Sequence, residues 1–117
     1  MGQADRNLER RAAPRFGVEC WAEECFEAGV YFHRVTNLSR GGFFVAKKLP
    51  FQVGQTIRVR LDLPGFADKP ETRSRVINNY RDPQDHLRGA GFQFLDLDAQ
   101  SRKIIEAFIQ KVTLQEK

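Results

Sequence analysis

The stretch of this sequence that decides the fold class is Ile57-Arg58-Val59-Arg60-Leu61-Asp62-Leu63. Every odd position in it is apolar, and every even position is charged. Because side chains of a β-strand point alternately to opposite faces, the pattern predicts a strand with one face in a core and the other in solvent. Pro64-Gly65 follows directly and ends the strand.

Five further strands are predicted on either side of this stretch. Short apolar or alternating segments are separated by Gly, Pro, Asn, Asp and Ser residues, which is typical of strands joined by turns. These segments are residues 16–20, 30–35, 43–46, 72–80 and 87–95. Phe43 and Phe44 are adjacent, so one of the two rings must face away from the core.

The hydrophobic period changes near the C-terminus. Apolar residues then recur three and four positions apart, which predicts one amphipathic helix with Asp98 or Ser101 as its N-cap. The positions that set this period are Ile104, Ile105, Phe108, Ile109 and Val112. Six short strands followed by one helix predict a mainly β fold, a small six-stranded antiparallel β-barrel with a C-terminal α-helix.

The length and composition indicate one domain with a real core. The chain has 117 residues, of which 41% are hydrophobic, and it contains ten Phe. Its net charge of +4 is modest, and four arginines lie within the first fifteen residues. We expect an Arg-rich N-terminal arm over residues 1–15 and a barrel with a terminal helix over residues 16–117. This charge distribution favours a small anionic ligand over a nucleic acid polymer.

The sequence shows no sign of secretion, membrane insertion or metal binding. The N-terminus lacks the apolar segment of a signal peptide. No apolar run approaches the roughly 18–20 residues needed to span a bilayer. Cys20 and Cys25 are too few for a disulfide framework, and their spacing is not that of a zinc site. We therefore expect a cytoplasmic protein without a metal ion.

Catalysis is not predicted either. Asp82, Asp85 and His86 share one loop, but such residues are the usual composition of a polar turn. The glycine-rich segments lack the Gly-Lys-Ser/Thr sequence of a phosphate-binding loop. No His, Cys or carboxylate pair forms a recognisable catalytic arrangement, so we expect a protein that is not an enzyme.

One candidate binding segment precedes the first predicted strand, in Arg10-Arg11-Ala12-Ala13-Pro14-Arg15. Its guanidinium groups repel one another unless solvent or an anion lies between them. Arginine can bind phosphate oxygens or the O6/N7 edge of guanine with two parallel hydrogen bonds, and it can stack on a purine. The alternative interpretation is a solvated basic tail.

A second candidate segment is Asn37-Leu38-Ser39-Arg40-Gly41-Gly42, which lies between two apolar strands. Gly41 and Gly42 would allow positive φ angles and the close approach of a ligand. Ser39 supplies a hydroxyl group, and the carboxamide of Asn37 can read a base edge. The alternative interpretation is an ordinary hairpin turn, in which Asn, Ser and Gly are expected.

Together, Arg11-x-x-x-Arg15 and Asn37-x-Ser39-x-x-Gly42 resemble the two-part signature of PilZ domains. The resemblance extends over nearly the whole chain, to the Gly-rich strand at Gly89–Phe94 and the terminal helix. It implies a six-stranded PilZ barrel that binds cyclic di-GMP, with no other cofactor. It also implies an effector protein, not identified by the sequence, in a motility or envelope-polymer machine.

The resemblance also implies roles for single residues. Arg11 and Arg15 would contact guanine edges and phosphates, and Asn37 would read a guanine Watson–Crick edge. Ser39 would contact the ligand from the turn, and Gly42 would allow its close approach. Arg10 suggests an intercalated pair of nucleotides. The family often has Asp where Asn37 stands, and a carboxamide offers a single acceptor oxygen to guanine, so we expect lower affinity.

Two other functions stay open at this point. A PilZ-fold adaptor can act through protein contacts without any nucleotide, although such members have usually lost the arginine motif that this chain keeps. A small RNA- or DNA-binding barrel would need aromatic side chains exposed on one face as a stacking platform. Most phenylalanines of this chain fall at positions predicted to face the core.

Overall fold

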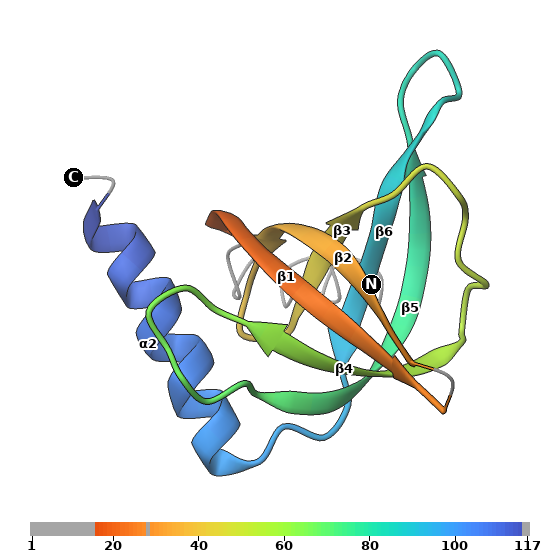
Figure 1. The fold of residues 1–117 in the computed structure, drawn as a ribbon. Coiled ribbons are helices and arrows are strands. Elements are labelled where there is room, and N and C mark those ends of the chain that lie inside the picture. Colours follow the sequence, from red (N-terminus) through yellow and green to blue (C-terminus); the bar gives the residue numbers. More distant parts are fainter. Residues whose placement is uncertain (1–15, 28, 116–117) are drawn as a thin grey trace, which may run out of the picture.

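The computed structural model describes residues 16–27 and 29–115, with only the backbone of Phe26 and Gln115, and contains six strands and a helix (Figure 1). The elements are β1 (Phe16–Phe26), β2 (Gly29–Leu38), β3 (Gly42–Ala46), β4 (Thr56–Asp62), β5 (Glu71–Arg81), β6 (Leu87–Phe94) and α2 (Ala99–Gln115). The strands form a closed antiparallel barrel in the order β1-β2-β3-β6-β5-β4. The predicted fold class is therefore confirmed.

The first two strands are longer than the sequence pattern predicted. β1 continues from the predicted end at Cys20 to Phe26, and β2 runs on through Asn37 and Leu38. The predicted turn at residues 37–42 is therefore shorter, with only residues 39–41 between β2 and β3. Glu23 and Glu24 hid the extension of β1, because acidic residues are depleted in strands.

The barrel interior is filled by the apolar positions of the alternating pattern. The four apolar positions of the stretch that decides the fold are all buried, namely Ile57, Val59, Leu61 and Leu63. Phe43 also points inward and stacks on Phe92 with ring centroids 4.9 Å apart. Phe44, its neighbour in the chain, faces the other side of the sheet and is only partly buried.

Helix α2 lies along one side of the barrel and covers part of its core (Figure 1). Its buried hydrophobic residues are Ile105, Phe108 and Ile109. The helix begins after Asp98, whose Oδ1 accepts a hydrogen bond of 2.7 Å from the backbone N–H of Ser101. This confirms Asp98 as the N-cap, and the same bond lowers the pKa of its carboxyl group.

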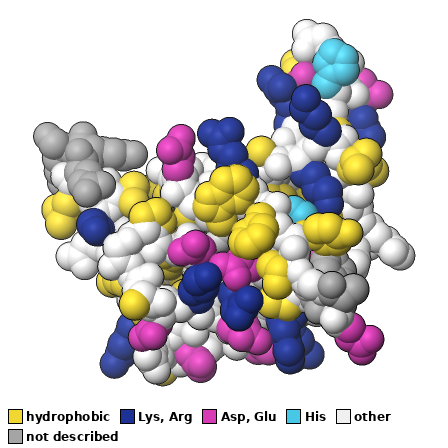
Figure 2. All heavy atoms as spheres, viewed as in Figure 1, with side chains coloured by type: hydrophobic (Ala, Val, Ile, Leu, Met, Phe, Trp, Pro, Cys, Tyr) yellow, Lys and Arg dark blue, Asp and Glu magenta, His cyan; other side chains and the backbone are white. Residues whose placement is uncertain are grey.

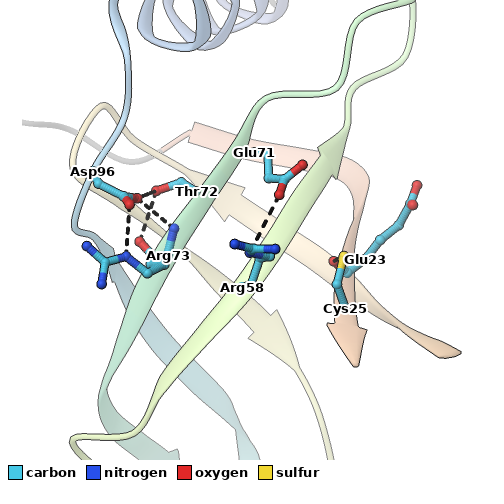
Figure 3. Close-up of polar contacts among 7 residues, drawn as sticks. All are labelled: Glu23, Cys25, Arg58, Glu71, Thr72, Arg73 and Asp96. Carbon is cyan, nitrogen blue, oxygen red and sulfur yellow. Dashed lines mark hydrogen bonds and ion pairs between the residues drawn. The ribbon is translucent and has the colours of Figure 1, made fainter. Parts of the chain in front are cut away.

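A polar cluster joins the end of β6 to β5 (Figure 3). Asp96 Oδ1 accepts hydrogen bonds from the backbone N–H of Arg73 at 2.7 Å and from the Thr72 hydroxyl at 2.8 Å. Its Oδ2 accepts one from Arg73 Nε at 2.9 Å. The backbone bond first, then the two side-chain bonds, lower the pKa of Asp96 to about 2. The chain that leads into α2 is thus held against the barrel.

Candidate ligand-binding site

The turn between β2 and β3 is built around the hydroxyl of Ser39. Ser39 Oγ accepts hydrogen bonds from the backbone N–H groups of Gly41 at 3.2 Å and Gly42 at 3.1 Å, and it donates one of 3.3 Å to the Gly42 carbonyl. A serine hydroxyl has one donor and two acceptor positions, so its whole capacity is used within the turn. Ser39 is 5% exposed. The structure thus gives Ser39 a role in shaping the turn.

The two glycines of the turn have different surroundings. A Cβ atom added to Gly42 would lie 1.9 Å from the backbone oxygen of Phe92, whereas one added to Gly41 would meet only Ser39 Oγ, at 3.9 Å. Neither glycine has a positive φ, so that expectation was wrong. Gly42 is needed because β3 and β6 approach each other closely at this point.

The side chain of Asn37 lies on the outer face of the barrel and carries a buried hydrogen-bond acceptor. Its partners in the sheet are Gly17 of β1 and Phe44 of β3. The atom Asn37 Oδ1 is buried, and no described residue donates a hydrogen bond to it. A buried acceptor without a donor costs about 1–3 kcal/mol. Such an atom points to a donor from elsewhere, either a ligand or water.

The outer face continues from Asn37 across three more strands. Phe44 is opposite Gly91 of β6, which in turn is opposite Asn78 of β5. The rings of Phe44 and Tyr80 lie 5.3 Å apart. Asn78 Oδ1 is a second buried acceptor without a donor among the described residues. Aromatic rings and amide oxygens that receive no hydrogen bond from the described residues thus share one face, which is a suitable surface for a base.

Sequence reasoning missed Asn78 and Tyr80. The signal available was Asn78-Asn79 inside a predicted strand, because asparagine is depleted in strands. Asn79 proves to be structural, since its side chain makes two hydrogen bonds to the backbone of Phe51, at 3.0 and 2.8 Å. Only their side-chain contacts show that Asn79 supports the fold, whereas Asn78 has an acceptor that no described residue uses.

A groove of about 640 Å³ lies beside this face, between the barrel and α2. Two bulges adjoin it, between Gly17 and Cys20 in β1 and between Val35 and Asn37 in β2. Bulges bend strands and often occur next to binding sites. The residues that line the groove are Gly17, Val18, Glu19, Arg34, Thr36, Pro64, Gly65, Phe108, Lys111 and Val112. Of the predicted ligand residues that the structure describes, none is among them, although Gly17 is paired with Asn37.

The comparisons with known proteins agree with this architecture. The PilZ domain family model matches residues 9–111. This chain belongs to the PilZ domain family. No curated protein sequence matches the chain.

Solved structures with the same PilZ fold are similar to this one at low sequence identity. The inhibitor of motility MotI/DgrA from Bacillus subtilis has a TM-score of 0.77 and 21% identity, with 92% of this chain and 53% of that chain covered. The PilZ domain of YcgR from Escherichia coli with c-di-GMP has a TM-score of 0.66 and 14% identity, and coverage is 92% and 94%. The K. pneumonia MrkH–c-di-GMP complex has a TM-score of 0.76 and 18% identity, with coverage of 92% and 54%. This PilZ domain thus spans about half the length of MotI/DgrA and MrkH.

Four of the seven predicted ligand residues of this PilZ domain can be located. Asn37, Ser39, Gly41 and Gly42 lie together at the β2–β3 turn. Arg10, Arg11 and Arg15 lie outside the described residues. Phe16, the residue that follows Arg15, is paired with Leu38, so the described chain begins beside the same turn.

The described part of the PilZ domain shows neither a group of metal-ligating residues nor a membrane-spanning helix. Within residues 16–27 and 29–115, no three His, Cys, Asp or Glu side chains are grouped so that they can hold a metal ion. The helix that the structure describes is not long and apolar enough to cross a membrane. Asp82 Oδ1 accepts backbone hydrogen bonds from Gln84 and His86, at 3.0 and 2.9 Å, which gives Asp82 a structural role in the β5–β6 loop.

Proposed function

We propose that this PilZ domain is a cytoplasmic receptor for cyclic di-GMP without catalytic activity. A partner protein recognises the ligand-bound form of the domain. The nucleotide binds on the outer face of the barrel at the β2–β3 turn, and Arg10, Arg11 and Arg15 close over it. The observation that carries the proposal is the buried Asn37 Oδ1, which receives no hydrogen bond from the described residues and lies beside a turn whose shape Ser39 maintains. The c-di-GMP complexes of YcgR and MrkH, which share the fold, support the choice of ligand.

Each group in the proposed site binds a particular part of the ligand. Cyclic di-GMP has two phosphates and two guanines, so it needs cations, hydrogen-bond acceptors and flat surfaces together. Asn37 Oδ1 accepts a hydrogen bond from a guanine N–H, and Arg11 and Arg15 bind phosphates and guanine edges. Phe44, which is paired with Asn37, and Tyr80, whose ring lies against that of Phe44, offer an aromatic surface. Ser39 acts through the turn, while its direct contact with the ligand remains a prediction from the family resemblance.

Calorimetric titration of the purified chain with cyclic di-GMP tests the proposal. We expect saturable heat from the wild type. Removal of one charge-assisted contact is worth about 1.5–3 kcal/mol, so Arg11→Ala and Arg15→Ala should each weaken binding roughly 10- to 150-fold. Arg58→Ala is the matched control, because Arg58 lies on β4 and pairs there with Glu71 at 3.6 Å (Figure 3).

The negative outcomes separate the other functions. The absence of heat at high micromolar ligand would overturn the proposal and favour an adaptor that works without nucleotide. Salt-sensitive binding to single-stranded RNA of any sequence would favour a polymer-binding barrel. That reading needs exposed aromatic residues, and Trp21, Tyr31 and Phe32 are exposed on β1 and β2. A parallel titration with RNA therefore belongs to the same experiment.

A further inference from the structure

The two buried amide acceptors on the outer face of the barrel lie too far apart to serve a single base. Asn37 is on β2 and Asn78 is on β5, with β3 and β6 between them. Neighbouring strands lie about 4.8 Å apart, so roughly 14 Å separates the two backbones across the sheet. A guanine that donates a hydrogen bond to Asn37 Oδ1 therefore leaves Asn78 Oδ1 still without a donor from the described residues.

The surroundings of Asn78 suit a second base. A Cβ atom added to Gly91, its partner on β6, would lie 3.5 Å from Asn78 Oδ1 and 3.1 Å from Cε2 of Tyr80. The amide oxygen and the tyrosine ring are thus neighbours over a stretch of backbone that carries no side chain. The ring of Phe44 lies next to that of Tyr80, with centroids 5.3 Å apart. An acceptor beside aromatic rings is a common arrangement for binding an unstacked base.

An arginine without a described acidic partner lies on the same face. β4 and β5 carry five arginines, of which four form ion pairs with carboxylates, namely Arg58, Arg60, Arg73 and Arg81. The fifth is Arg75, whose exposed guanidinium makes no ion pair or hydrogen bond with the described residues. Arg75 is opposite Gln93, which is opposite Gly42 of the β2–β3 turn. Figure 2 shows further Lys and Arg side chains along the β5–β6 hairpin, which stands out from the barrel.

We infer that Asn78, Arg75 and Tyr80 bind a second guanine of cyclic di-GMP, an inference that rests on the proposed function. Asn78 Oδ1 accepts a hydrogen bond from the guanine N1–H, and the guanidinium of Arg75 donates to O6 and N7. The Tyr80 ring turns away from Gly91 to admit the base and stacks on it. The second guanine comes from the same nucleotide or from a second molecule, and the stoichiometry of binding distinguishes these two sources.

This subsite prefers guanine over adenine. Adenine has no N1–H, so its N1 places a second acceptor against Asn78 Oδ1. Its N6 amino group stands where guanine has O6 and directs donors at the donors of Arg75. A site built to hydrogen-bond one base rejects another whose groups leave it unpaired. The stacking surface of Tyr80, in contrast, accepts either base.

Calorimetric titration of the full chain with cyclic di-GMP and with cyclic GMP-AMP of the same linkage tests the inference. The wild type should bind cyclic di-GMP about tenfold or more tightly than cyclic GMP-AMP, because an adenine does not fit the second subsite. Asn78→Ala and Arg75→Ala should each weaken binding of cyclic di-GMP about tenfold and change that of cyclic GMP-AMP by less than about threefold. Asn78→Asp keeps an acceptor oxygen and should retain the preference. Tyr80→Ala should weaken binding of both nucleotides.

Arg58→Ala is the matched control for Arg75→Ala. Arg58 is also an exposed arginine of the sheet, but it lies on β4 and pairs with Glu71 at 3.6 Å. Its replacement should leave both affinities within about twofold of wild type. Urea unfolding checks that the variants are folded. Asn78→Ala should be as stable as the wild type, because Asn78 Oδ1 accepts no hydrogen bond from the described residues.

The outcomes separate this inference from the proposed function. A wild type that binds both nucleotides equally overturns the inference, and so does an Asn78→Ala variant that keeps the preference or loses affinity for both nucleotides to the same extent. In each of these cases the proposed function stands if Arg11→Ala still weakens binding. A wild type that binds neither nucleotide overturns both.

Discussion

Two polar regions of this PilZ domain differ in how completely their hydrogen bonds are made. At the end of β6, Asp96 accepts three hydrogen bonds from Thr72 and Arg73. On the outer face near the β2–β3 turn, Asn37 Oδ1 and Asn78 Oδ1 are buried and receive none from the described residues. The first region stabilises the folded chain by itself. The second is complete only when a donor arrives, which is why we place the ligand there.

The largest expected effect is a difference in stability between alanine variants of the two glycines of the turn. Gly42→Ala should destabilise the domain by about 2–4 kcal/mol, because the new Cβ forces β3 away from β6. Gly41→Ala should change stability by less than about 0.5 kcal/mol, since its surroundings are open. Urea unfolding measures both. Equal losses for the two variants would contradict the assignment of Gly42 to strand packing.

The next effect distinguishes Asn79, whose side chain makes two hydrogen bonds, from Asn37, whose Oδ1 receives none from the described residues. Asn79→Ala should cost about 1–3 kcal/mol of stability, because the backbone of Phe51 loses two hydrogen bonds. Asn37→Ala should leave stability unchanged or slightly higher, since no donor among the described residues loses a partner. Binding of cyclic di-GMP should respond the other way, with a roughly tenfold loss only for Asn37→Ala. A folded Asn37→Ala variant with wild-type affinity would remove Asn37 from the site.

A smaller effect concerns the chemistry of position 37. Asn37→Asp replaces the carboxamide with a carboxylate, which can accept hydrogen bonds from both guanine N1–H and N2–H₂. We expect cyclic di-GMP to bind roughly three- to tenfold more tightly at pH 7. Titrations of both proteins in one buffer measure this. Weaker binding by the aspartate variant would show that Asn37 does not read the Watson–Crick edge.

The smallest effect is a pH dependence of the stability that the Asp96 hydrogen bonds contribute. Because the pKa of Asp96 is lowered to about 2 in the folded chain, its carboxylate contributes stability above its ordinary pKa of 3.8. That contribution is lost as the pH falls from about 4 to 2. The stability difference between wild type and Asp96→Asn should therefore be constant from pH 7 to 5 and shrink below pH 4. Asp68→Asn, whose carboxylate accepts no hydrogen bond from the described residues, is the matched control, and urea unfolding at each pH is the measurement. A difference independent of pH would contradict the low pKa.

Most of the fold was predictable because it depends on local patterns. The alternation from Ile57 to Leu63 predicted β4 and its buried face, and the change of period predicted α2 with Asp98 as its cap. The extension of β1 through Glu23 and Glu24 was not predictable in this way. Both carboxylates find partners from other segments, Arg60 and Lys69 for Glu23 and His33 for Glu24. Pairing with distant residues overrode the low strand propensity of glutamate.

Only part of the candidate site could be predicted from the sequence. The motif Asn37-x-Ser39-x-x-Gly42 predicted a turn with functional residues, and the structure brings these residues together. It assigned Gly42 to ligand approach, however, whereas the structure assigns it to contact with β6. One ring of the adjacent Phe43 and Phe44 was predicted to face outward, and the structure shows that it is Phe44. Asn78 and Tyr80 were missed. Their membership of the same face follows from the β3–β6–β5 register.

By itself, the sequence determined which segments are strands, which is the helix and which family signature the chain carries, because each depends on residues close together in the chain. Only the tertiary structure decided which acceptors lack a donor among the described residues and which glycine is required. These properties depend on backbones and side chains that meet from distant positions. In a closed barrel, the register of all the strands together determines which distant residues lie next to each other.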